Sequence, residues 1–189
     1  MELFGRLVLV VGPSGAGKDT LIDYARERLR ADQRVHFVRR IISRPTGPGE
    51  DHEPVDTDEF NRRALEGGFS FDWQAHGLSY GIPSEIDDWL DRGDVVVANA
   101  SRAILPDARR KYPQLLVVNV TAPMGVLALR LVERGRENLE SIRQRLIRGE
   151  QQSVQGDDVV HINNSGAPEV AGERLLEHVL FNPVHILRF

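Results

Sequence analysis

A glycine-rich segment near the N-terminus has the spacing of a phosphate-binding loop. It reads Gly12-Pro13-Ser14-Gly15-Ala16-Gly17-Lys18-Asp19-Thr20 and fits the pattern GxxxxGK. Glycines let successive backbone N–H groups turn towards an anion, and the N-terminus of a following helix adds partial positive charge. A lysine at this position reaches the β- and γ-phosphates of a nucleoside triphosphate. We therefore predict that all nine residues bind the phosphates of ATP and that Lys18 acts in catalysis.

Asp19 departs from this motif, which has Ser or Thr after the lysine to hold Mg²⁺. The two later apolar strands supply no obvious replacement, because they are followed by Asn99 and Thr121 rather than by an acidic residue. A carboxylate beside the phosphates would repel them unless a cation lay between. Our hypothesis is that Asp19 positions Mg²⁺, directly or through water. The alternative is that Asp19 only offsets the helix dipole and Thr20 serves the metal.

A second group of residues suited to phosphate chemistry is a run of arginines. A lid that closes over the transferred phosphoryl group needs such planar, permanently charged donors. Arg134 and Arg136 flank Gly135, a residue able to act as a hinge, so we predict that both arginines take part in catalysis. The alternative, retained for Arg145 and Arg148, is a solvated helix face whose arginines pair with neighbouring glutamates. The run comprises Arg130, Arg134, Arg136, Arg143, Arg145 and Arg148.

Two further arginines stand where a second anionic substrate would lie opposite ATP. Arg44 follows an expected strand, and Arg102 follows the turn that begins at Asn99. Arginine binds phosphate through two parallel hydrogen bonds. Tyr80 and His76 are able to donate to a phosphate or hydroxyl, although isolated residues of this kind more often pack within a ribbon.

Apolar runs alternate with amphipathic segments along the chain. This alternation predicts an α/β fold of three layers, in which helices cover both faces of a mostly parallel sheet. Ligands bind such folds at the carboxyl ends of the strands, where residues 12–20, 99–102 and 163–166 fall. Strands are expected at 6–12, 35–42, 95–98, 115–120 and 158–162, and helices at 18–30, 57–66, 83–92, 105–112, 123–133, 139–152 and 168–181.

The length of 189 residues predicts a single domain with three functional parts. We expect a core of about residues 1–42, 94–132 and 153–189. A small acceptor-binding lobe is expected at about 43–82, with an antiparallel ribbon at 69–74 and 78–80, and an arginine-rich lid at about 133–152.

The composition argues against several classes of protein. A net charge of −4 and a pI of about 5.9 predict no general attraction to nucleic acid or to an anionic membrane. The chain has no cysteine, which excludes a disulfide framework and a thiolate zinc site. Without a signal peptide or a membrane-spanning run, a cytoplasmic location is expected. The apolar segment 181–189 leaves open whether the chain forms a homo-oligomer.

Over nearly its whole length, the chain resembles the guanylate-kinase-like P-loop kinases. The matching pieces are GPSGAGKD, SRPTGPGE, DEF, FDWQAHGLSYG and RGREN before RQRL. Within this group it is most similar to the ribose 1,5-bisphosphate phosphokinases of phosphonate catabolism. That likeness lies in Asp19, in the N-x-SRA-x-LP-x-AR-x-x-Y block from Asn99 to Tyr112, and in RGREN from Arg134 to Asn138. The resemblance implies the P-loop fold of the nucleoside monophosphate kinases, with ATP and Mg²⁺ as cofactors.

Departures from true guanylate kinases bear on the acceptor. The chain keeps Arg44 and Tyr80 but has Gly47 where those enzymes have a second phosphate-binding arginine. It also lacks their D-x-D strand end. Since a guanine base needs specific polar partners, this loss argues against a purine nucleotide. The resemblance instead implies that Arg44, Tyr80, Ser101 and Arg102 bind a ribose that carries two phosphates.

The expected reaction is phosphorylation of α-D-ribose 1,5-bisphosphate by ATP, which gives 5-phospho-α-D-ribose 1-diphosphate and ADP. An alternative is a guanylate kinase or another nucleoside monophosphate kinase. A more remote alternative is a guanylate-kinase-like module that binds a protein without catalysis, although such a module could dispense with Lys18.

Overall fold

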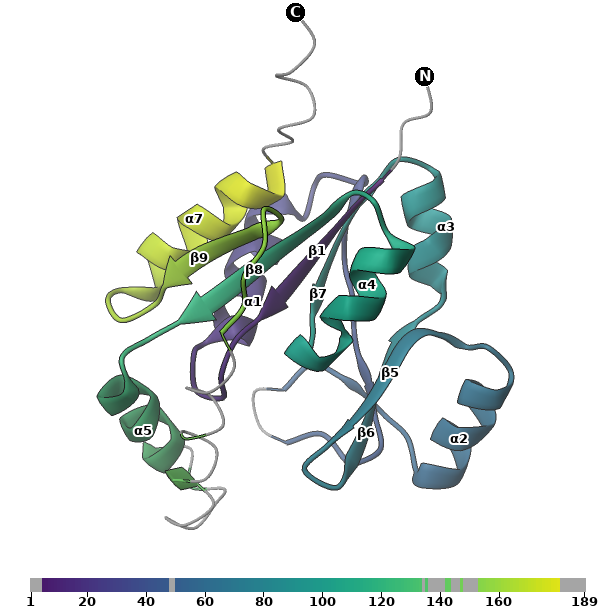
Figure 1. The fold of residues 1–189 in the computed structure, drawn as a ribbon, viewed down its shortest axis with the longest axis horizontal. Coiled ribbons are helices and arrows are strands. Elements are labelled where there is room, and N and C mark those ends of the chain that lie inside the picture. Colours follow the sequence, from purple (N-terminus) through teal and green to yellow (C-terminus); the bar gives the residue numbers. More distant parts are fainter. Residues whose placement is uncertain are drawn as a thin grey trace, which may run out of the picture. The chain divides into compact units, whose positions relative to one another are not determined.

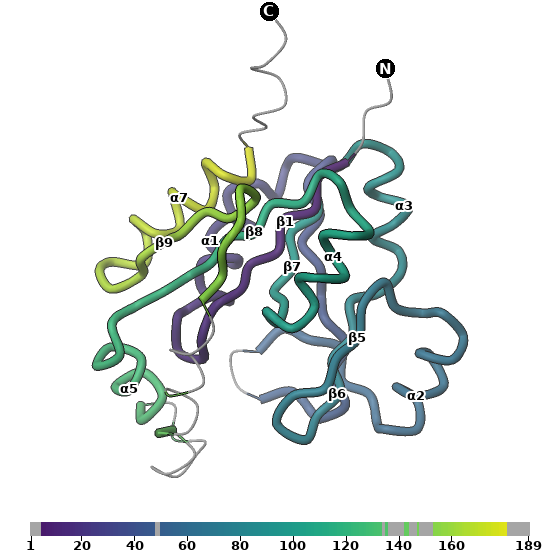
Figure 2. The backbone as a smooth tube through the Cα atoms, viewed as in Figure 1, coloured from purple at the N-terminus to yellow at the C-terminus, as the bar shows by residue number. Residues whose placement is uncertain are grey.

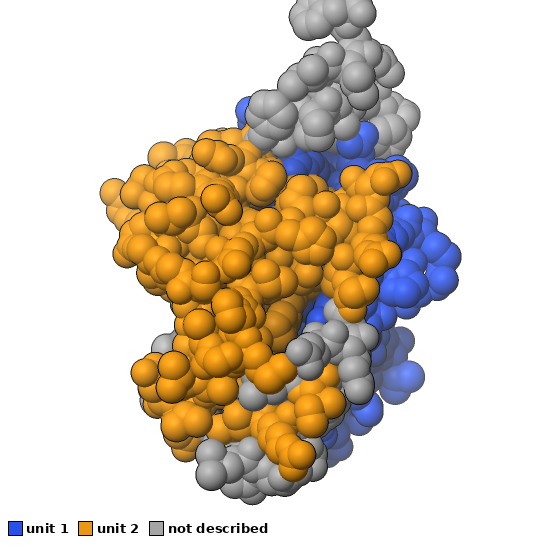
Figure 3. Space-filling model, turned by 60° about the vertical axis from the view of Figure 1, so that its left-hand side comes forward, with its two compact units in different colours: residues 1–9, 33–115 blue, residues 10–32, 116–189 orange. Residues whose placement is uncertain are grey.

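The protein is described by a computed structural model over residues 5–47, 50–133, 135, 142–143, 147 and 153–180. It divides into two compact units, which are coloured differently in Figure 3. Unit 1 comprises residues 1–9 and 33–115, and unit 2 comprises residues 10–32 and 116–189. Strand β1 (Arg6–Val11) begins in unit 1 and ends in unit 2.

Unit 2 is built from parallel strands and the helices that cover them. β8 lies between β1 and β9, and β8 and β9 pair in parallel from Val117 to Thr121 of β8. α1 and α7 pack together on one face of these strands (Figure 1). Apolar residues at helical spacing are buried there, among them Leu21 and Leu175. The elements are α1 (Lys18–Leu29), β8 (Leu115–Thr121), α5 (Met124–Glu133), β9 (Val159–Asn163) and α7 (Pro168–Leu180).

Unit 1 contains a second group of parallel strands and, beside it, a smaller sheet. The parallel strands follow the order β2-β7-β1, and their core residues Leu7, Val96 and Val97 are fully buried. β7 is a continuous apolar run, as a strand covered on both faces requires. The elements of this part are β2 (Val35–Phe37), α3 (Glu85–Asp91), β7 (Val95–Asn99), the 3₁₀ turn η1 (Arg102–Ile104) and α4 (Leu105–Lys111).

The smaller sheet of unit 1 has the strand order β4-β3-β6-β5. Figure 2 shows β5 and β6 as adjacent arms joined by a turn, and they pair antiparallel. At that turn His76 and Gly77 have φ angles of 54° and 73°. The predicted ribbon is confirmed and reaches further, to Pro83. The elements are β3 (Ile41–Ile42), β4 (Glu53–Pro54), α2 (Thr57–Leu65), β5 (Phe69–Ala75) and β6 (Leu78–Pro83).

The expectation of one strand over residues 35–42 is wrong. β2 ends at Phe37, and β3 belongs to the smaller sheet, where it pairs with β6. Arg39 lies between the two strands and forms an ion pair with Asp51 at 3.0 Å. Two charged residues interrupt the apolar pattern here. At this point the chain leaves one sheet and enters the other.

One predicted helix start is also wrong. Pro83 is the last residue of β6, and α3 begins only at Glu85. The predicted start of α2 at Thr57 is confirmed, and the cap is the preceding residue, Asp56, whose carboxylate accepts the Glu59 N–H at 2.8 Å. A carboxylate is the better cap since it also offsets the helix dipole. The helix expected at 139–152 lies largely outside the described residues. The described residues within this range, 142–143 and 147, are helical.

Apart from the short strand β4, which the sequence does not predict, the remaining strands and helices lie within a few residues of their predicted positions. The predicted α/β architecture with a mostly parallel sheet is therefore confirmed. In the described part of the chain, no helix is long and apolar enough to cross a membrane.

Candidate active site

The predicted phosphate-binding loop follows β1 in unit 2 and leads directly into α1. Gly12, Gly15 and Gly17 have φ angles of 141°, 84° and 86°, which side chains rarely adopt. A Cβ atom at Gly12 would lie 2.1 Å from the backbone oxygen of Val120 on β8. Glycine is thus required at this turn for both conformation and space. The loop ends at the N-terminus of α1, which gives it the local dipole of an anion site.

The Lys18 side chain reaches back across this loop. Its Nζ donates hydrogen bonds to the carbonyl oxygens of Gly12 and Pro13, at 3.0 and 3.1 Å. The ammonium group therefore lies at the loop, as the sequence predicts. Asp19 and Thr20, the two candidate metal residues, are both exposed in the first turn of α1.

Asn164, in the turn after β9, supports the loop although it is distant from it in the sequence. It is 2% exposed, and its Nδ2 donates to the Ala16 carbonyl oxygen at 2.8 Å. Its backbone N–H donates to the Thr121 carbonyl oxygen at 2.7 Å. A Cβ atom at Gly17 would lie 2.4 Å from the same Nδ2. The sequence places the turn at the correct sheet edge but does not identify this supporting role.

Helix α5 carries the first of the predicted arginines to the loop. Arg130 Nη1 donates to the Gly15 carbonyl oxygen at 3.4 Å. After α5 ends at Glu133, Gly135 has a φ of 62°, in agreement with the predicted interruption of the helix. Arg134 and Arg136 lie outside the described residues, so their role stays a prediction.

Arg44 and Tyr80, two predicted acceptor residues, both lie in the smaller sheet region of unit 1. Arg44 is not isolated, because its Nη1 and Nη2 donate to the two carboxylate oxygens of Glu50 at 2.7 and 3.0 Å. Hydrogen bonding to Glu50 raises the pKa of Arg44. The Tyr80 ring stacks on Trp73 with centroids 5.4 Å apart. The sequence does not reveal the Arg44–Glu50 pair, because the intervening prolines and glycines indicate only an irregular loop.

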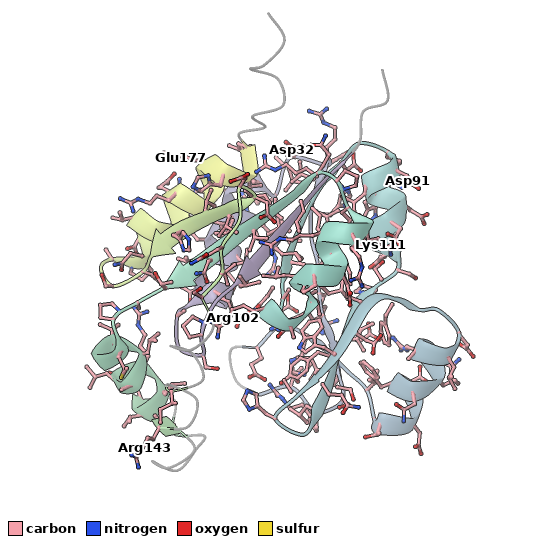
Figure 4. All side chains as sticks on the ribbon, viewed as in Figure 1. Asp32, Asp91, Arg102, Lys111, Arg143 and Glu177 are labelled. Carbon is pink, nitrogen blue, oxygen red and sulfur yellow. The ribbon has the colours of Figure 1, made fainter. Side chains whose placement is uncertain are left out.

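Ser101 and Arg102 begin the η1 turn, also in unit 1. The Ser101 hydroxyl accepts the Ala103 N–H at 3.2 Å and so caps the turn. Burial lowers the pKa of the half-buried Arg102. Figure 4 shows Arg102 and Lys111 at opposite ends of the segment formed by η1 and α4.

A cavity of about 360 Å³ lies between β5 and α4 in unit 1. None of the predicted acceptor residues lines it, and its two acidic and two basic residues give no excess of positive charge. It is therefore not the anion site that the sequence predicts. The lining residues are Ser70, Phe71, Asp72, Ile104, Asp107, Arg110 and Lys111.

Comparison with known proteins agrees with this geometry. A scan against protein-family models finds no match. The structure is similar to that of guanylate kinase from Anaplasma phagocytophilum, with a TM-score of 0.70 and 18% identity over 94% of this chain and 86% of the other. At that identity the likeness shows the fold alone. The fold and the glycine loop with Lys18 together define a P-loop fold of the guanylate-kinase type.

Curated relatives give the family. The chain is 50% identical over 176 residues to ribose 1,5-bisphosphate phosphokinase PhnN of Brucella melitensis, covering 93% of this chain and 92% of the relative. It is 54% identical over 176 residues to the protein of that name from Acidiphilium cryptum, covering 93% of each. For the Agrobacterium fabrum protein the identity is 47% over 173 residues, with 90% and 94% covered. The chain belongs to the ribose 1,5-bisphosphate phosphokinase family, and it is a kinase that uses ATP.

Proposed function

We propose that the chain transfers the γ-phosphoryl group of ATP to the C1 phosphate of α-D-ribose 1,5-bisphosphate. The products are 5-phospho-α-D-ribose 1-diphosphate and ADP. The observation that carries the proposal is an identity of 50% over 93% of this chain to a relative named for that phosphokinase activity. From the resemblance noted in the sequence we propose that the reaction belongs to phosphonate catabolism. Since ATP and a doubly phosphorylated sugar are intracellular metabolites, we also propose a cytoplasmic location.

The chemistry requires alignment more than proton transfer. An oxygen of the C1 phosphate attacks the γ-phosphorus, and the bond from that phosphorus to the β–γ bridging oxygen breaks. The electron pair of the broken bond stays with ADP. A phosphate ester has a second pKa of about 6, so its oxygen is already deprotonated at neutral pH and needs no general base. Catalysis then rests on holding the two phosphates in line and on neutralising charge.

Residues 12–20 form the proposed ATP site, in which backbone N–H groups hold the phosphates. Lys18 exchanges its bonds to the Gly12 and Pro13 carbonyl oxygens for bonds to the β- and γ-phosphates. Its present position at the loop supports that assignment. Arg134 and Arg136 complete the charge neutralisation as the predicted lid arginines.

Mg²⁺ fits the donor set when the phosphates of ATP supply most of its ligands. The described residues contain no group of three or more His, Asp or Glu side chains able to hold a metal by themselves. Mg²⁺ bound by nucleotide phosphates needs only one or two carboxylates beside its waters. Asp19, exposed in the first turn of α1, supplies one in our proposal, and Thr20 is the alternative. When bound, the ion neutralises charge on the β- and γ-phosphate oxygens.

The acceptor site is assigned to Arg44, Tyr80, Ser101 and Arg102 of unit 1. Two of these are arginines, which suit a substrate with two phosphates. Ser101 uses its oxygen to accept the Ala103 N–H and so retains its hydroxyl proton as a donor. The net charge of −4 gives no reason to add nucleic acid or a membrane surface as a partner.

The deciding experiment measures ADP release with ribose 1,5-bisphosphate and, in parallel, with GMP. We expect turnover with ribose 1,5-bisphosphate and little with GMP. The Lys18→Ala variant serves as the control for contaminating kinases, since it should lose activity by a factor on the order of 10² or more while it stays folded. Preference for GMP would favour the guanylate kinase alternative, and activity retained without Lys18 would contradict the mechanism.

A further inference from the structure

Glu50 fixes the orientation of Arg44 in the loop that follows β3. The carboxylate of Glu50 accepts from Arg44 Nη1 at 2.7 Å and from Nη2 at 3.0 Å. Arg44 Nη1 also donates to the Pro45 carbonyl oxygen at 2.9 Å. Glu50 in turn accepts the Gly47 N–H at 3.0 Å. The guanidinium is therefore held at one end by a carboxylate that is itself tied to the loop backbone.

The backbone on either side of this pair is held by a buried histidine. His52 is 2% exposed, and its Nε2 lies 3.2 Å from the Arg44 carbonyl oxygen. Its Nδ1 lies 3.8 Å from a Glu50 carboxylate oxygen, and its own carbonyl oxygen accepts from Arg39 Nη2 at 3.0 Å. The pair is thus built into the fold and is not a loose surface contact.

The hydrogen bonds of Arg44 leave one edge of its guanidinium available. A guanidinium has five N–H donors in a rigid plane. Among the described residues, the bonds to Glu50 and Pro45 engage both Nη1 protons and one Nη2 proton. The remaining donors, Nε–H and the second Nη2–H, are parallel and lie on one side. That side is a complete fork for two oxygens of a phosphate.

We propose that Glu50 is a positioning residue for the acceptor, which presents the free edge of Arg44 to a phosphate of the sugar substrate. This inference rests on the proposed function and identifies the residue that prepares its acceptor site. A preoriented arginine loses less side-chain freedom on binding than a mobile one, so Glu50 favours binding although it carries the same sign of charge as the substrate. The opposite possibility is that the phosphate must displace Glu50 from Arg44. Removing the charge of Glu50 would then strengthen acceptor binding instead of weakening it.

The test compares Glu50→Gln with Glu53→Gln by steady-state kinetics. Glu53 is a matched control because it lies on β4, directly after the loop that carries Glu50, and bonds to Arg63, at 2.7 Å, instead of to Arg44. For Glu50→Gln we expect the KM for ribose 1,5-bisphosphate to rise about tenfold, as the loss of a charge-assisted bidentate pair implies. Its kcat and its KM for ATP should stay within about twofold of wild type, because the residue contacts neither ATP nor the reacting atoms. The control should change none of these values.

A second variant guards against a merely structural effect. Arg44→Lys keeps the charge but lacks the fork, so it should raise the same KM, and adding Glu50→Gln to it should have little further effect. Additive effects, or an unchanged or lower KM in Glu50→Gln alone, would overturn the proposal. A raised KM for ATP in that variant would do so too, because it would indicate general disruption.

Titration of ribose 1,5-bisphosphate by calorimetry, without ATP, separates this proposal from the proposed function. Binding by wild type that weakens in Glu50→Gln, without any turnover, would support the role of Glu50 and overturn the proposed reaction. Turnover by wild type with equal acceptor binding in both proteins would overturn the role of Glu50 alone. Absence of binding to the wild-type protein would overturn both.

Discussion

Asn164 and Ala16 are joined by a hydrogen bond of 2.8 Å, from the side-chain Nδ2 of the first to the carbonyl oxygen of the second. They lie 148 positions apart in the chain. The orientation of the amide is determined, because a flipped Asn164 would place its own oxygen against the Ala16 carbonyl. The shape of the phosphate-binding loop therefore depends on the turn after β9 as well as on the loop's own glycines.

Asn164→Asp should weaken ATP binding. The substitution keeps the size of the side chain but places a carboxylate oxygen against a carbonyl oxygen in a buried position. We expect the free energy of unfolding to fall by about 1–3 kcal/mol and the KM for ATP to rise. Asn163→Asp is the matched control, since the Oδ1 of exposed Asn163 accepts the Ser165 N–H and the substitution preserves that acceptor. Urea unfolding and ATP kinetics measure the two effects. Equal behaviour of the two variants would contradict the supporting role of Asn164.

Asp19→Asn and Thr20→Ala distinguish the two proposals for the metal. If Asp19 positions Mg²⁺, removing its charge should raise the Mg²⁺ concentration needed for half-maximal rate, and Thr20→Ala should have a small effect. If Thr20 serves the metal, the order is reversed. Titration of activity with Mg²⁺ at fixed ATP measures this directly. Wild-type Mg²⁺ dependence in Asp19→Asn would eliminate the role that we assign to that carboxylate.

Much of the fold follows from local pattern. Buried parallel strands such as β7 are continuous apolar runs, and the helices between them carry their apolar residues at helical spacing. The pattern fails at residues 35–42, where a single apolar segment with two arginines serves two sheets. Nothing within that segment indicates the change of sheet, because it is determined by distant partners, Val97 for the end of β2 and β6 for β3.

The candidate site is likewise predictable from the sequence only in part. The phosphate-binding loop is predictable because its function depends on local backbone conformation, and Gly12, Gly15 and Gly17 have the positive φ angles that such a loop needs. Asn164 is not predictable, because its contact to the loop is made only in the folded chain. Glu50 is likewise hidden, since an acid in an irregular loop gives no sign of which arginine it will bind.

Asp87 is predicted to make the stability of unit 1 dependent on pH. Its carboxylate accepts hydrogen bonds from the Tyr112 hydroxyl, from Ser70 Oγ at 2.7 Å and from Lys111 Nζ at 3.0 Å. Partial burial alone would raise the pKa of Asp87, but these bonds outweigh it and hold the pKa below its ordinary value. The stabilisation is therefore complete above the unfolded-state pKa of about 3.9 and is lost as the pH falls through the lower folded-state pKa.

Asp87→Asn tests this dependence. At pH 7 we expect a loss of about 1–2 kcal/mol in the free energy of unfolding, at the lower end of what such bonds contribute because the side chain is 36% exposed. The difference from wild type should shrink as the pH falls below about 4. Asp91→Asn, an exposed position on the same helix, is the control and should change little. Denaturant unfolding between pH 3 and 7 measures the free energy of unfolding of both variants. If this free energy depended on pH in the same way in wild type and in Asp87→Asn, Asp87 would be excluded as the source of the pH dependence.

Gly172→Ala should destabilise unit 2 although alanine is the better helix former. Gly172 lies within α7, and a Cβ atom there would be 2.5 Å from the Tyr24 ring of α1. The ring cannot easily move, because its hydroxyl bonds to Glu173 and Arg28 lies 4.7 Å from its centroid. We therefore expect a loss of about 1–3 kcal/mol from overpacking.

Gly125→Ala on α5 provides the opposite case. A Cβ atom at this exposed helical position meets nothing within 4 Å, so the gain in helix propensity should appear without a clash. Alanine should then stabilise the protein by about 0.4–1 kcal/mol. Thermal or urea unfolding of the two variants gives changes of opposite sign if α1 and α7 pack as closely as the structure indicates. A stabilising Gly172→Ala would show that the two helices are able to separate enough to admit a methyl group.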